Sequence, residues 1–247
     1  MTETAPQIPA PTPPPEHVQD RAAAKESEQG PLRRAVAHRI RTVQHDYRND
    51  GPQAAQVLAR LRRGIGRQAT ETPDLWGLVG MEQFYAAQPQ GQHLDEADAL
   101  RAERAAHVAV TLWALHQQSN RAKRMHVADG ASLGTAVRRL MSGADSDEQI
   151  RKRLLRAGTA TTFDVLAQRL RELVVLLRTA EIPLDYGLLA EQLDQWQRPG
   201  GPGRVRQAWG RSFHAAYRAP AGTDPQQSGT PGQPENDAST NETKDET

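Results

Sequence analysis

The chain has 247 residues, of which 37% are hydrophobic, a formal net charge of +1 and no cysteine. The lack of cysteine excludes disulfides and thiolate chemistry, so a metal site would need histidines and carboxylates. No apolar run approaches the roughly 20 residues that span a bilayer, and the N-terminus lacks the basic and apolar regions of a secretory signal. We therefore expect a cytoplasmic protein with no membrane partner.

The two ends of the chain differ in composition from its middle. Residues 1–30 and 219–247 are rich in Pro, Gly, Gln, Thr and acidic residues and nearly lack large apolar side chains. Such segments cannot bury enough surface to offset the entropy of ordering, so we predict two disordered tails around a core at 31–218. That core has 28 basic and 19 acidic residues, and this excess favours a polyanionic partner.

Apolar residues in the core recur at intervals of three and four, which is the period of an amphipathic helix. No segment alternates like a strand. We predict helices, in chain order, at 33–48, 53–63, 74–87, 95–118, 133–142, 146–157, 162–180, 186–197 and 203–217. The helix at 162–180 is the clearest, with a stripe of Phe163, Leu166, Leu170, Leu173 and Leu177 and a cap at Thr161 or Thr162. The predicted fold class is all-α: a compact bundle of about nine helices, in one or two subdomains.

The first helix, 33–48, contains His45 and Asp46, a pair that resembles the His-Asp pair of helical phosphohydrolases. Such enzymes need further His and Asp ligands in a recognisable order, and the sequence has no clear complement. No HExxH motif or serine nucleophile motif is present either. We therefore predict no metal, no cofactor and no enzymatic activity. A metal-dependent phosphohydrolase remains the least favoured alternative.

The second helix ends in ARLRRGIGR, which places two glycines among four arginines. A phosphate-cradling loop would follow a strand and open a helix, whereas these glycines follow a helix. We interpret Gly64 as a C-cap in the left-handed conformation. On a helical wheel Arg60, Arg63 and Arg67 form an outward ridge, with Arg62 at its flank. The opposite stripe is Val57, Leu61 and Ile65.

Further basic segments follow along the chain. The loop 120–124 contains Arg121, Lys123 and Arg124. Arg138 and Arg139 flank the apolar stripe of 133–142, and Lys152, Arg153 and Arg156 lie opposite the stripe of Ile150, Leu154 and Ala157 in 146–157. In 203–217, Arg204 and Arg211 align with Arg218, opposite Val205, Trp209, Phe213 and Ala216. We predict that these ridges form a polyanion track, because Arg and Lys bind phosphates without reading sequence. The four tryptophans are expected in the core.

The helices 133–142 and 146–157 also allow a second hypothesis, a helix-turn-helix DNA-binding regulator. Such a regulator reads base edges with side chains at the first turn of its second helix. Here that turn is Asp145, Ser146, Asp147 and Glu148, in which Asp145 and Glu148 have the spacing of a capping box. Acidic side chains at this position would repel phosphates, so the regulator is the less favoured alternative.

Taken together, these residues resemble the small subunit of the type I-E CRISPR surveillance complex Cascade, the CasB family. The resemblance covers roughly residues 52–214. It rests on the order of several motifs: LARLRRG, PDLW, WALHQQS, MH followed by GASLGTAVRRL, EQIRKRLLRAGTATTFDVLAQRLRELVVLLR, IPLDYGLLAEQLDQW and VRQAWGRSF. The family pattern has two aromatics where this chain has Phe213 and His214.

The resemblance implies an all-helical, non-enzymatic protein that occupies the complex in two copies beside other Cascade subunits. It also implies contacts with the guide RNA and target DNA, along the RNA–DNA hybrid and the displaced strand. The positions that align with family contact sites are Arg62, Arg63, Lys123, Arg124 and Arg156. The remaining ridge residues come from the helical wheels alone.

Overall fold

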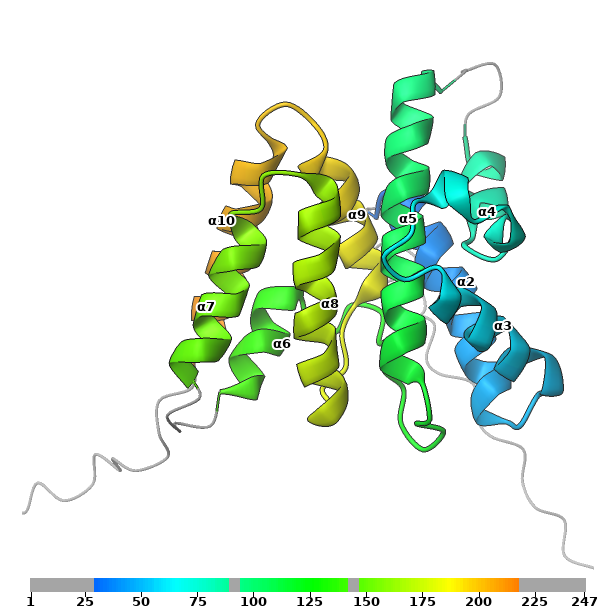
Figure 1. Ribbon diagram of the computed structural model, residues 1–247, viewed down its shortest axis with the longest axis horizontal. Helices are drawn as coiled ribbons and strands as arrows, with labels where there is room; N and C mark the ends of the chain where they lie inside the picture. Colours follow the sequence, from blue (N-terminus) through cyan, green and yellow to red (C-terminus); the bar gives the residue numbers. More distant parts are fainter. Residues whose placement is uncertain (1–28, 89–93, 142–146, 218–247) are drawn as a thin grey trace, which may run out of the picture. The chain divides into compact units, whose positions relative to one another are not determined.

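Figure 1 shows a computed structural model of the protein, in which residues 29–88, 94–141 and 147–217 are described. Within these ranges the chain forms nine α-helices, two short 3-10 turns and no strand, so the all-helical prediction is confirmed. All the helices belong to the unit that ends at Tyr217. The predicted tails lie outside the described residues, apart from Gln29 and Gly30.

All the helices but α4 begin and end close to the predicted positions. They are α2 (Pro31–Arg48), α3 (Pro52–Arg63), α4 (Met81–Ala86), α5 (Glu96–Gln117), α6 (Leu133–Leu140), α7 (Asp147–Gly158), α8 (Phe163–Thr179), α9 (Tyr186–Trp196) and α10 (Gly201–Ala215), with the 3-10 turns η1 (Ala69–Glu71) and η2 (Pro73–Leu75) between α3 and α4. None of the helices is long and apolar enough to cross a bilayer, so far as the described ranges extend.

Helix α5 lies among the others, because alanines and larger apolar residues cover most of its circumference. Its buried residues include Ala105, Ala109, Val110 and Trp113, and it packs against α2, α3, α8 and α9 (Figure 1). A helix that is apolar on nearly all sides is stable only when other helices surround it.

The predicted stripe on α8 is confirmed, since all five of its apolar residues are buried. The Thr162 side chain caps this helix by accepting a hydrogen bond from the Val165 amide. A second close contact joins α6 to α10. There a Cβ on Gly134 would lie 2.1 Å from the Trp209 carbonyl oxygen, so the two backbones can approach each other only because residue 134 has no side chain.

The helix predicted at 74–87 is wrong in its first half, where 3-10 turns and a loop precede α4. Gly77 and Gly80 have φ of +76° and +89°, a conformation that interrupts a helix and favours glycine. Trp76 lies in this loop with 72% of its surface exposed, so its predicted core position is also wrong. The other three tryptophans, Trp113, Trp196 and Trp209, are buried as predicted.

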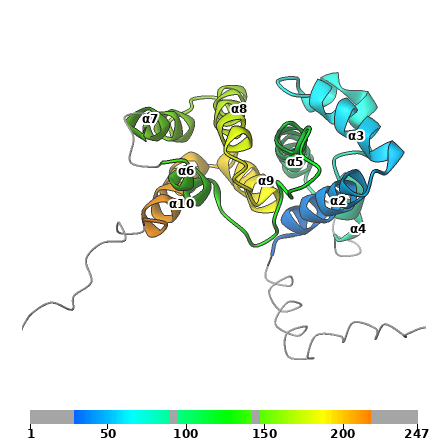
Figure 2. The same ribbon diagram turned by 90° about the horizontal axis from the view of Figure 1, so that it is seen from below.

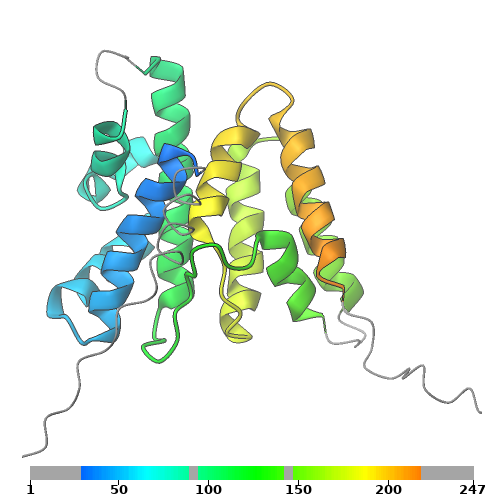
Figure 3. The same cartoon turned by 180° about the vertical axis from the view of Figure 1, so that it is seen from behind.

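The helices that carry the predicted ridges do not all lie on one side of this unit. In the view of Figure 2, α7, α8 and α3 lie along one side, and α10 and α2 along the other. Figure 3, from behind, accordingly brings α10 and α2 to the front. The helices that carry predicted ridges, among them α3, α7 and α10, therefore lie on both sides of this unit in that view.

Candidate nucleic-acid interface

The C-terminal end of α3 is shaped by packing around Gly64. Gly64 does cap the helix, but with φ of −78°, so the predicted left-handed conformation is wrong; Gly66, with φ of +77°, has it instead. Residue 64 is glycine for another reason, because a Cβ there would lie 2.4 Å from Leu75 Cδ1 and 3.1 Å from His107 Cε1. The glycine thus allows η2 and α5 to pack against the helix end.

His107 ties this helix end to α5. Its Nε2 lies 3.1 Å from the Gly64 carbonyl oxygen and 3.0 Å from that of Arg67, and both oxygens can only accept. Burial lowers the pKa of His107, against the two carbonyl contacts that raise it. The neutral imidazole with its proton on Nε2 therefore suits the site, and it acts as a structural clamp.

The four arginines at this end have different surroundings. Arg60 donates to the Asp74 carbonyl oxygen, and Arg67 Nη2 donates to that of Glu71 at 3.0 Å. Arg62 is half-buried, and its Nε is shielded from solvent. Arg63 is exposed and has no hydrogen bond or ion pair to any described residue. The wheel therefore identified the outward residue correctly.

The predicted inward stripe on α3 is rotated relative to the observed one. Of its members only Leu61 is buried, while Val57 and Ile65 are half-buried. Ala54 and Leu58 complete the buried face. Ile65 lies past Arg63, the last helical residue, and therefore does not follow the helical period, whereas Val57 lies inside the helix beside the buried Leu58.

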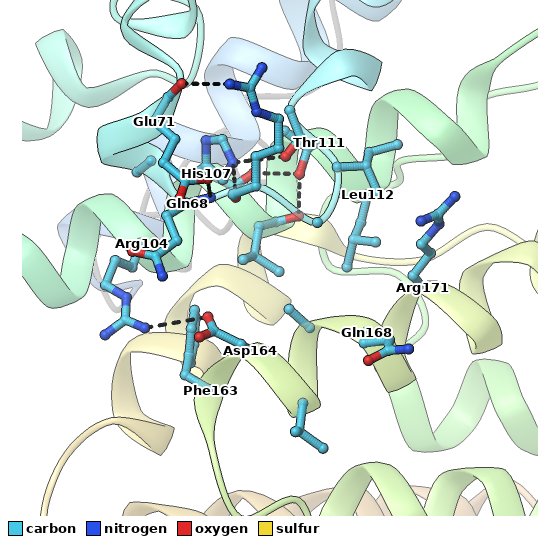
Figure 4. Close-up of a pocket in the computed structure, with 18 residues that line it drawn as sticks. Gln68, Glu71, Arg104, His107, Thr111, Leu112, Phe163, Asp164, Gln168 and Arg171 are labelled. Atoms are coloured by element: carbon cyan, nitrogen blue, oxygen red, sulfur yellow. Dashed lines mark hydrogen bonds and ion pairs between the residues drawn. The ribbon is translucent and has the colours of Figure 1, made fainter.

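A groove of about 490 Å³ opens beside this helix end, between residues 64–69, α5 and the first turns of α8 (Figure 4). Arg104 lies at its edge, 3.6 Å from the Asp164 carboxylate and 4.8 Å above the Phe163 ring. Arg171 lines the groove from α8 and is exposed. Neither arginine is among the contact residues predicted from the sequence. The signal for Arg171 was its position off the α8 apolar stripe.

The basic loop 120–124 is held in place by two buried glutamines. Gln44 on α2 accepts from the His126 amide at 2.9 Å and donates to the His126 carbonyl oxygen at 3.0 Å. Gln117 on α5 accepts from the Met125 amide at 3.0 Å and donates to the Lys123 carbonyl oxygen at 3.0 Å. The loop backbone is therefore fixed from both helices, and sequence inspection identified neither glutamine.

The basic side chains of this loop differ in whether they have a partner among the described residues: two are held by such a partner, and one is free of any. Arg121 forms an ion pair with Asp50 and lies 4.6 Å above the Tyr47 ring. Lys123 pairs with Glu181, and this hydrogen bond is the main cause that lowers the pKa of the Glu181 carboxyl. Arg124 is exposed and contacts no described residue by hydrogen bond or ion pair. It is the cation of this loop that remains available to a ligand.

The basic residues of α6 and α7 show the same division. Arg138 is half-buried and lies 4.7 Å above the Tyr217 ring. Lys152 lies 3.8 Å from Glu148, and Arg153 pairs with Glu172 at 3.0 Å. Arg139 and Arg156 are exposed, and neither side chain has a polar partner among the described residues.

The core side of α7 largely follows the prediction. Leu154 and Ala157 are buried, and Ile150 is half-buried. Glu148 is exposed in the first turn of α7, where it pairs with Arg151. An acidic first turn does not suit a recognition helix. The predicted capping residue Asp145 lies outside the described residues.

On α10 three of the four predicted stripe residues, Val205, Trp209 and Phe213, are buried, whereas Ala216 follows the last helical residue and is only half-buried. Arg204 Nη2 donates to the Pro199 carbonyl oxygen at 3.1 Å. Arg211 is exposed and has no polar partner in the described part of the chain. Arg218, the third member of the predicted alignment, lies outside it.

His45, the residue behind the phosphohydrolase alternative, is exposed on α2. Its Nε2 lies 3.0 Å from Asn49 Nδ2. No group of three or more His, Asp or Glu side chains that could hold a metal ion occurs within the described ranges.

Comparisons with known proteins identify the family. The family model of the CRISPR-associated protein Cse2 matches residues 57–214. The crystal structure of CasB from Thermobifida fusca is 51% identical, covers 76% of this chain and 99% of its own, and has a TM-score of 0.68. CasB from Thermus thermophilus shares the fold at 24% identity and a TM-score of 0.51, covering 73% of this chain and 98% of its own.

A chain of a solved CRISPR RNA-guided surveillance complex also shares the fold, at 22% identity and a TM-score of 0.51, covering 75% of this chain and 94% of its own. No curated protein sequence matches. The family match spans α3 to α10, and the resemblance noted in the sequence is confirmed over that range. The chain belongs to the Cse2 (CasB) family of CRISPR-associated proteins.

Proposed function

We propose that the protein is a non-catalytic, cytoplasmic subunit of a CRISPR RNA-guided surveillance complex, in which it binds nucleic-acid backbone and stabilises the R-loop during antiviral defence. Its partners are the guide RNA, the target DNA, the other Cascade subunits and a second copy of itself. One observation carries the proposal. On a chain of the Cse2 family, five of the predicted contact residues are exposed arginines without a polar partner in the described residues, namely Arg63, Arg124, Arg139, Arg156 and Arg211.

Free arginines on fixed helices suit this task. An RNA–DNA hybrid is about as stable as the DNA duplex that it replaces, so modest contacts to the backbone can shift the equilibrium toward the open state. Guanidinium groups bind phosphates without reading bases, and a surveillance complex must accept any target. Arg63 and Arg156 lie on α3 and α7, which line the same side in Figure 2.

The test is a pair of double variants with equal charge change. Arg63→Ala plus Arg156→Ala removes two free arginines, whereas Arg151→Ala plus Arg198→Ala removes two that are paired with carboxylates. Target binding is measured across a salt series with the assembled complex. The first double variant should bind more weakly and lower the slope of log K against log salt by about 1.5, at 0.7–0.9 per lost phosphate contact. The second should change the slope far less.

Equal slopes for both double variants would contradict the proposal, provided that circular dichroism shows each to be folded. Membership of the complex is tested separately. Native mass spectrometry of material that copurifies with the tagged chain should give a ribonucleoprotein with two copies of the chain and a short RNA. A lone dimer bound to one duplex sequence would instead indicate the DNA-binding regulator.

A further inference from the structure

Trp76 is exposed in a protein that buries its other tryptophans. Its surface is 72% exposed, against at most 8% for Trp113, Trp196 and Trp209. An indole is among the largest apolar groups that a fold can bury, so leaving it in solvent forgoes stabilisation. The candidate site described above does not use this side chain.

The loop that carries Trp76 is anchored on both sides of it. Leu75 and Val79 are buried at 2% and 7% exposure. A Cβ on Gly80 would lie 3.1 Å from the Ala35 carbonyl oxygen of α2, so the backbone itself contacts that helix. The exposed indole is therefore held by packed neighbours, and its exposure does not result from a loose segment.

Two arginines from different helices also hold this loop by its carbonyl groups. Arg60 of α3 donates to the Asp74 carbonyl oxygen. Arg39 of α2 donates through Nε to that of Leu78 at 3.0 Å. These carbonyls lie two residues before and two residues after Trp76, so the backbone that carries the indole has a fixed position before any ligand arrives.

The chemistry around Trp76 differs between its two sides. Leu75 packs against Gly64 at the end of α3, which brings the loop beside the helix end that carries Arg63. On the other side, the Glu82 carboxylate lies 3.2 Å from the Cβ position of Gly77. A phosphate is attracted to the arginine end of α3 and repelled by Glu82, and the exposed indole of Trp76 adds an apolar, aromatic surface to this loop.

We infer that Trp76 is a stacking platform for one unpaired base of a nucleic acid strand whose phosphates contact the arginine end of α3. Aromatic side chains next to backbone-binding cations are the arrangement by which proteins bind single strands without sequence preference. Bases inside a duplex are stacked on each other and cannot cover the indole. The inference rests on the proposed function, and it adds a preference for unpaired over paired strands at this site.

The test uses the full-length chain and two probes of equal length, an oligothymidine and an oligomer with the same phosphates but no bases. The wild-type protein should bind the abasic probe about 5- to 150-fold more weakly, which is the range of one stacked base. Trp76→Ala should remove this difference, and Trp76→Phe should restore part of it. Tyr85→Ala, which removes another exposed aromatic ring, on α4, should leave the difference unchanged.

Fluorescence provides an independent measurement, because Trp76 is the exposed tryptophan among four. Oligothymidine should quench the emission that acrylamide can reach, and the abasic probe should not. Equal affinity for both probes without quenching would overturn the stacking inference and leave the backbone contacts standing. Binding of neither probe by the wild-type chain would overturn the proposed function, and the stacking inference with it.

Discussion

Lowering the pH from about 7.5 to about 5.5 should reduce the free energy of unfolding by about 3 kcal/mol, because two histidines are buried in neutral form. His116 on α5 and His126 in the following loop are at most 1% exposed. Burial is the largest cause that lowers the pKa of each to about 4, from the ordinary value of 6.5. Both contact Tyr186: its hydroxyl lies 2.9 Å from His116 Nδ1, and its amide donates to His126 Nδ1 at 3.2 Å.

The sign and size follow from proton binding in the two states. Well above pH 6.5 neither state is protonated, and stability is fully present. Between 6.5 and 4 only the unfolded chain binds these protons, so stability falls as the pH falls. At pH 5.5, one unit below the ordinary pKa, the protonated form of each imidazole in the unfolded chain exceeds the neutral form about tenfold. This ratio corresponds to about 1.4 kcal/mol of lost stability per group. Burial also lowers the pKa of His107, and this adds in the same direction.

The assay is urea denaturation followed by circular dichroism at both pH values. The variant His116→Phe plus Tyr186→Phe removes one titrating group together with its hydroxyl partner, which avoids leaving an unpaired polar group in the core. It should lose about half as much stability as the wild type. His38→Asn, on the exposed side of α2, should lose as much as the wild type. Equal wild-type stability at the two pH values would refute the reasoning.

Two further predictions concern packing and the basic loop. Gln44→Ala leaves the buried amide and carbonyl groups of His126 unpaired and should lower the free energy of unfolding by about 2–5 kcal/mol in urea denaturation. The control Gln56→Ala, at an exposed position, should change it by less than about 0.5 kcal/mol. A loss below about 1 kcal/mol for Gln44→Ala would show that water replaces the glutamine. Gly134→Ala should cost at least about 2 kcal/mol, because its Cβ would meet the α10 backbone. Gly210→Ala, which has open space around it, should instead stabilise by about 0.5–1 kcal/mol, and equal effects of the two would contradict the packing argument.

The helices could be predicted from the sequence because their signals are local. The α8 stripe and its Thr162 cap depend on residues within a few turns of each other, and the chain adopts them as predicted. The segment before α4 could not be predicted in this way. Its course depends on left-handed glycines at 77 and 80 and on anchors from α2, and a periodic pattern at 74–87 contains no information on either.

The roles of single residues were harder to predict than the helices, since they depend on distant partners. In the sequence Gly64 looks like a helix cap, but residue 64 must be glycine because Leu75 and His107 pack against it. Gln44 is an ordinary polar residue until His126, 82 positions away, is placed beside it. Net charge identified the basic segments, but not which of their cations are already held.

The distinction between held and free cations refines the candidate interface. Arg121, Lys123 and Arg153 would have to leave a carboxylate before binding a phosphate, and that exchange cancels much of the gain. Arg63 and Arg211 have no such partner to lose among the described residues. The fourteen predicted contact residues are therefore not equivalent: substitutions at the free arginines should lower both affinity and salt slope, while substitutions at the paired ones should act mainly through the carboxylates that they release.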